Sequence, residues 1–116
     1  MKLNKKKILK DVKKYYSGRI YGAGSYGLAE RCVDLGQEWV DAHQWGFDDD
    51  ESLVNKSPKE MKQELRQYVR ARISYSDYNA TFLPMFIWMW IAQAIITWII
   101  NKILDNILEK RGDLLL

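Results

Sequence analysis

The feature that most constrains this chain is an apolar stretch from residue 82 to residue 100. These nineteen residues, FLPMFIWMWIAQAIITWII, carry no charge, and their only polar side chains are Gln93 and Thr97. As a helix rising about 1.5 Å per residue, the stretch is about as long as the hydrocarbon core of a bilayer is thick. It therefore predicts either a transmembrane helix or a helix buried on most sides inside an assembly.

Beyond residue 100 the pattern becomes amphipathic, so we expect one long helix that runs to about residue 110 and ends at Gly112. A polar line runs along this helix at four-residue spacing: Gln93, Thr97, Asn101, Asp105 and Glu109. A helix that faces only lipid does not need a polar line. The line therefore favours contact with protein at least as much as contact with lipid.

Three shorter helices are predicted before the long one. Apolar residues recur at helical spacing over residues 3 to 16, 26 to 43 and 58 to 73. In the third helix, Ser57 suits the N-cap, Pro58 the first position and Glu60 the third position of a capping box. The prediction is an all-α fold with a basic N-terminal arm (1–20), a small helical region (21–77) and a long C-terminal helix with its tail (78–116).

A glycine-rich segment lies between the first two predicted helices. Gly22, Gly24 and Gly27 match G-x-G-x-x-G, but a dinucleotide site needs a strand before the motif, and here a basic helix precedes it. We therefore expect a flexible connector, with Ser25 as the N-cap of the helix that follows. No cofactor is predicted.

Charge is distributed in blocks along the chain. Residues 1–20 carry a net charge of +7 and residues 30–51 a net charge of −7, within an overall charge of +3. Such blocks indicate contacts with partners, between copies or within the chain. The lysines of the first helix predict contact with an anionic partner, either nucleic-acid phosphates, lipid headgroups or acidic protein, although a solvated face explains them equally well: Lys5, Lys6, Lys7, Lys10, Lys13 and Lys14.

Residues suited to catalysis or metal binding are sparse. His43 and Cys32 are the single histidine and the single cysteine, and each is expected to be packed within the fold. The acidic run at residues 48–51 lacks the alternating ligands and the glycine of a calcium loop. We therefore expect no metal site and no enzymatic activity.

The favoured interpretation is a non-enzymatic structural or accessory subunit of a large assembly, such as a virus particle. The long helix would be buried against protein subunits, either other proteins or copies of the same chain. The lysine arm would dock on an acidic neighbour or on packaged nucleic acid. The long helix would contact a partner or a membrane through the following residues: Phe86, Trp88, Trp90, Ile95, Ile96, Trp98, Ile99, Ile103 and Ile107.

The alternative is a tail-anchored membrane protein, holin-like or part of a membrane complex. Residues 82–100 would span the bilayer, with the N-terminal region in the cytoplasm. Arg66, Arg70 and Arg72 precede the apolar stretch, as the positive-inside rule requires of a cytoplasmic flank. The start of the chain lacks the apolar core of a secretory signal, so none is expected.

Overall fold

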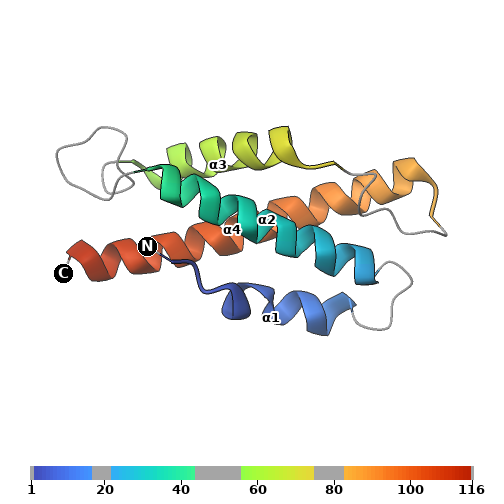
Figure 1. The fold of residues 1–116 in the computed structure, drawn as a ribbon, viewed down its shortest axis with the longest axis horizontal. Helices are drawn as coiled ribbons and strands as arrows, with labels where there is room; N and C mark the ends of the chain where they lie inside the picture. Colours follow the sequence, from blue (N-terminus) through green and yellow to red (C-terminus); the bar gives the residue numbers. More distant parts are fainter. Residues whose placement is uncertain (1, 17–21, 44–55, 75–82, 116) are drawn as a thin grey trace.

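The computed structural model describes residues 2–16, 22–43, 56–74 and 83–115. These residues form four α-helices (Figure 1), which are α1 (Lys5–Tyr16), α2 (Gly22–Ala42), α3 (Pro58–Arg72) and α4 (Met85–Leu115). The predicted all-α fold, with three shorter helices before a long apolar one, is confirmed. The acidic run at residues 48–51 and the joint at residues 75–79 lie outside the described residues.

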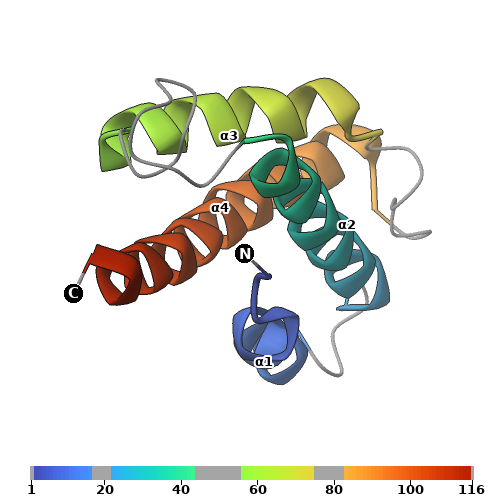
Figure 2. The ribbon, with the colours of Figure 1, turned by 60° about the vertical axis from the view of Figure 1, so that its left-hand side comes forward.

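The helices α2 and α4 cross at the centre of the bundle. Each packs against the other and against both remaining helices, whereas α1 and α3 do not touch each other through their described residues. Figure 2 shows α1 and α3 on opposite sides of the central pair. One hydrophobic core therefore joins residues from all four helices.

α4 supplies the largest share of the core. The residues on its inner face recur three and four positions apart, as one side of a helix requires, and each is fully buried: Trp88, Ala92, Ile95, Ile96, Ile99, Ile100, Ile103 and Ile107. Burying each of the six isoleucine side chains among them stabilises the fold by about 1.5–3 kcal/mol. From Trp88 onward, one side of the apolar stretch is thus covered by the chain's own helices.

α1 and α3 cover the core with narrower apolar stripes. α3 buries Met61, Leu65 and Val69, which lie at successive four-residue steps. Its predicted start is confirmed, because the Ser57 hydroxyl accepts a hydrogen bond from the Glu60 N–H at 3.2 Å and Pro58 is the first helical residue. On α1 the corresponding buried residues are Ile8, Leu9 and Val12, and Leu3 packs beside them just before the helix begins.

The prediction of a glycine-rich connector up to Gly27 is wrong for residues 22–27, because α2 already begins at Gly22. Ser25 is not an N-cap but a fully buried residue inside the helix. It continues the stripe that includes Leu28 and Cys32, both also fully buried. Packing of this stripe outweighs the weak helix propensity of the glycines.

The prediction that Gly112 ends the last helix is also wrong, since α4 continues to Leu115. One glycine costs a helix only about 1 kcal/mol relative to alanine, which neighbouring contacts can offset. One such contact is beside it, because the Arg111 guanidinium donates a hydrogen bond to the Lys56 carbonyl oxygen ahead of α3. This bond ties the last turns of α4 to the bundle.

Candidate docking surfaces

Most of the residues predicted to contact a partner or a membrane face the chain's own core. Six of them are fully buried among the other helices: Trp88, Ile95, Ile96, Ile99, Ile103 and Ile107. Trp98 is partly buried against the same core, with the Lys102 ammonium 5.4 Å from its ring centre. In this fold the contacts that the sequence assigned to a partner are made by α1, α2 and α3.

The first turns of α4 are different, because large apolar side chains there are open to solvent. Phe86 is 74% exposed and Trp90 77% exposed, and Met85 and Met89 beside them are 42% and 38% exposed. These four residues, at spacings of one, three and four, form one patch that we call the α4 tip. Figure 1 shows the start of α4 projecting past the end of α3. Contiguous exposed apolar patches mark docking sites.

A second surface runs along the outside of α3. Lys59, Lys62, Arg66 and Arg70 follow one another at spacings of three or four residues, which places them on one side of the helix. We call this surface the α3 basic face. Together with Gln63 and Gln67 these residues line an open hollow of about 500 Å³. Glutamates of α3 do not line it.

Arg66 has a donor that the described residues leave without an acceptor. Its Nε atom is buried, and no hydrogen-bond partner is found for it. A buried donor without an acceptor costs about 1–3 kcal/mol, more when the group is charged. The neighbouring Arg70 does have a partner, because its Nη2 donates to the Gln93 Oε1 of α4 at 2.9 Å.

The predicted anionic-partner lysines of α1 fall into two groups. Lys5 pairs with Asp34 of α2 and Lys7 with Glu109 of α4, each at 3.0 Å. The hydrogen bond that the Lys5 ammonium donates to the Asp34 carboxylate is the main cause that raises the pKa of Lys5. Of the two pairs, Lys5–Asp34 joins the basic block at residues 1–20 to the acidic block at residues 30–51, as the intramolecular alternative predicted, whereas Glu109 lies outside the acidic block.

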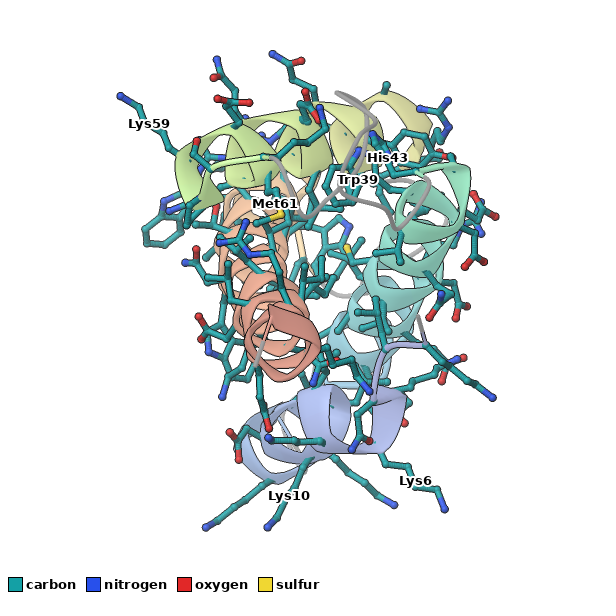
Figure 3. The ribbon with its side chains drawn as sticks, turned by 90° about the vertical axis from the view of Figure 1, so that its left-hand side faces the viewer. Lys6, Lys10, Trp39, His43, Lys59 and Met61 are labelled. Carbon is teal, nitrogen blue, oxygen red and sulfur yellow. The ribbon has the colours of Figure 1, made fainter. Side chains whose placement is uncertain are left out.

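The other four lysines of α1 are exposed and make no ion pair with any described residue: Lys6, Lys10, Lys13 and Lys14. We call this surface the α1 lysine face. Three of the four border an open groove of about 720 Å³, which also reaches Tyr26 of α2. In Figure 3, Lys6 and Lys10 point away from the bundle on the side opposite Lys59. The two basic surfaces therefore face opposite directions.

Cys32 and His43 are packed, as predicted. Burial of the Cys32 side chain raises the pKa of its thiol to about 12, so it stays protonated near neutral pH. His43 follows the last turn of α2, with its Nδ1 2.6 Å from the Trp39 carbonyl oxygen and its ring 4.5 Å from the Trp39 ring. Within the described ranges, no group of three His, Cys, Asp or Glu side chains could hold a metal ion.

The sequence indicated Phe86, Trp90, Arg66 and Arg70 as contact or flanking residues. It did not indicate that they form the α4 tip and the α3 basic face. The prediction overlooked Met85 and Met89 in the α4 tip, and it grouped Lys62 with Arg66, Arg70 and Arg72 as a cationic cluster but left out Lys59. The spacing of Lys59, Lys62, Arg66 and Arg70 was visible in the sequence and could have indicated the α3 basic face. Which part of the apolar stretch stays exposed was not visible, because it depends on where α2 and α3 lie.

No known protein family, curated protein or solved structure matches this chain. Its function is therefore argued from these surfaces and their chemistry.

Proposed function

We propose that the protein is a non-enzymatic accessory subunit of a larger assembly and that it attaches through the α4 tip. The exposure of Phe86 and Trp90 carries the proposal, since the rest of the apolar stretch is largely covered by the bundle and these two side chains are not. Aromatic residues and methionine are enriched at the buried centres of protein contacts. The tip has both.

The α1 lysine face supports a second contact, with an anionic partner. Four ammonium groups on one exposed helix attract acidic protein surfaces and nucleic-acid phosphates, and this attraction weakens as salt is added. The sequence favours a virus particle as the assembly, and that remains a prediction. The proposed role as a subunit does not depend on which assembly it is.

One observation favours the alternative, in which residues 82–100 anchor the protein in a membrane. Residues Met85–Gly112 of α4 are long and apolar enough to cross a bilayer, by length and composition alone. In the bundle, however, 44% of the most apolar part of this helix is buried inside the protein. A membrane-bound form that keeps this fold would therefore lie on the surface of the bilayer and would not span it.

The proposal is tested by a double substitution in the α4 tip, Phe86→Ser with Trp90→Ser. Both side chains are largely exposed, so we expect the fold and its melting temperature to change little. We expect the variant, expressed in the native host, to migrate as a free small chain in gel filtration of an extract, whereas the wild-type chain migrates with the assembly.

The matched control is Ala94→Ser, which changes an exposed residue one turn further along α4. It should migrate as the wild type does. If the double variant is still recovered at the size of the assembly in the wild-type amount, the α4 tip is not the attachment surface and the proposal is rejected.

A further inference from the structure

We propose that the occupant of the α4 tip is an anionic lipid surface, which the tip and the α3 basic face bind together. The inference rests on the attachment role proposed for the tip, but it assigns that attachment to lipid in place of a protein surface, so that the assembly is a membrane-bound one. The protein would lie on the membrane, with its apolar tip at the level of the headgroups and its cations on their phosphates.

First, the α4 tip and the α3 basic face lie next to each other. Arg70, in the α3 basic face, donates a hydrogen bond to Gln93, which lies one helical turn after Trp90 on α4. Figure 1 shows the end of α3 lying alongside α4, whose first turns continue beyond it. The basic residues of α3 and the apolar residues of the tip are therefore neighbours along one side of the molecule.

The second step is the chemistry of the hollow on α3. Its lining includes four cations, Lys59, Lys62, Arg66 and Arg70, and no carboxylate. Gln63 and Gln67 complete the lining and add side-chain amide donors. Phosphate oxygens accept strong charge-assisted hydrogen bonds from guanidinium and ammonium groups. The hollow is therefore suited to the phosphate of a lipid headgroup.

The third step is the composition of the tip. Tryptophan is enriched where a membrane meets water, because its ring is amphipathic, and phenylalanine inserts from the apolar side of surface-bound helices. Phe86 and Trp90 are the most exposed of the large apolar residues in the described part of the chain. Cations beside an inserted apolar patch add attraction to anionic lipids.

The fourth step concerns partners of other chemistry. A single-stranded nucleic acid would engage the cations of α3 and could stack bases on Phe86 or Trp90, but it would leave Met85 and Met89 without a role. A bilayer surface covers the apolar patch and the cations at once. It also needs no rearrangement of the bundle, because the inner face of α4 keeps its contacts with α2.

The test is vesicle flotation of the purified full chain. We expect it to float with vesicles of phosphatidylcholine that contain about one third phosphatidylserine, and not with vesicles of phosphatidylcholine alone. Phe86→Ser with Trp90→Ser should weaken binding about tenfold or more, because the inserted apolar area is lost. Lys59→Gln with Lys62→Gln should weaken it by about tenfold, because two charges near the lipid surface are lost.

The matched control is Lys6→Gln with Lys10→Gln, which removes the same charge from the opposite side of the molecule (Figure 3). It should change binding less than about twofold, since α1 faces away from the bound surface. Equal losses from the two lysine pairs would overturn the inference, because they would show attraction by net charge alone. Absence of flotation with anionic vesicles would also overturn it.

Failure of this inference can be told apart from failure of the proposed function. If the wild-type chain ignores vesicles but the Phe86→Ser, Trp90→Ser variant is lost from the native assembly, the tip attaches to protein and the lipid inference alone is wrong. If that variant also stays in the assembly, both proposals are wrong.

Discussion

Gly36 lies on the buried side of α2, where α4 approaches closely. A Cβ at this position would lie 3.0 Å from the Cδ1 and 3.3 Å from the Cγ2 of Ile103, which is itself fully buried. In Gly36→Ala the gain in helix propensity, about 1 kcal/mol, opposes an overpacking cost of about 1–3 kcal/mol. We expect a net loss of about 1 kcal/mol in the free energy of unfolding, measured in urea.

Gly112 provides the matched control, because it lies in the same kind of helix but has nothing within 4 Å of an added Cβ. Gly112→Ala should therefore stabilise the protein by up to about 1 kcal/mol. If the two substitutions change stability in the same direction and by the same amount, the close approach of α2 and α4 at Gly36 is not present in solution.

The pKa of Asp11 depends on the packing of α1 against α4. Its carboxylate accepts a hydrogen bond from the Lys102 ammonium of α4 at 2.8 Å, and this bond is the main cause that lowers the pKa of Asp11 below 3.8. Because the folded pKa lies below the unfolded pKa, the pair stabilises the fold above the unfolded value. That contribution is lost as the pH falls through the folded pKa.

We therefore expect a carboxyl NMR titration to give Asp11 a pKa below its ordinary value. In Lys102→Met the pKa should rise toward 3.8, since the hydrogen bond and the nearby positive charge are both removed. An Asp11 pKa that is identical in the two proteins would show that α1 does not lie against α4 as described.

At the scale of single elements, the start of α3 offers a test of local stability. The Ser57 hydroxyl caps the helix by accepting from the Glu60 N–H. Ser57→Ala should lower the free energy of unfolding by about 1 kcal/mol, whereas Ser57→Asp should keep most of it, because a carboxylate can accept the same bond. An unchanged free energy of unfolding in Ser57→Ala would show that the cap contributes nothing.

The elements that the sequence predicted well are those whose local signals agree with their packing. α3 has a capping residue, a proline at its first position and one apolar stripe, and the structure shows all three features. α2 was predicted to start too late because its first residues are glycines, which locally favour a turn. Its start is helical because Ser25 and Leu28 pack into the core, and no local pattern reveals that contact.

The polar line of α4 could be predicted from the sequence, but the partners of its side chains depend on where the other helices lie. Each step of four residues turns about 40° around a helix, so the line moves from one side of α4 to another along its length. Gln93 at its start bonds Arg70 of α3, and Glu109 at its end pairs with Lys7 of α1. The chain's own helices thus satisfy both ends of a line that had indicated contact with a partner.

At the level of the whole molecule, the sequence predicted that the apolar stretch must be shielded from water. It did not predict what shields it. Charge, length and composition were compatible with lipid, with other subunits and with the chain itself. In the fold, α1, α2 and α3 cover the inner face of α4 and leave the α4 tip uncovered. The candidate docking site is therefore the part of the stretch that the fold does not cover, which periodicity alone could not identify.

Native hydrogen exchange of the purified chain in detergent-free buffer tests whether α4 is the core helix of a self-contained bundle. Amides of residues 95–107 should exchange slowest, because their side chains lie in the core, and those at 86–90 should exchange much faster. In mild urea, protection of residues 95–107 should disappear together with that of residues 28–40 in α2. Protection of residues 95–107 that arises only when detergent or lipid is present, while α2 and α3 are protected without it, would contradict the account.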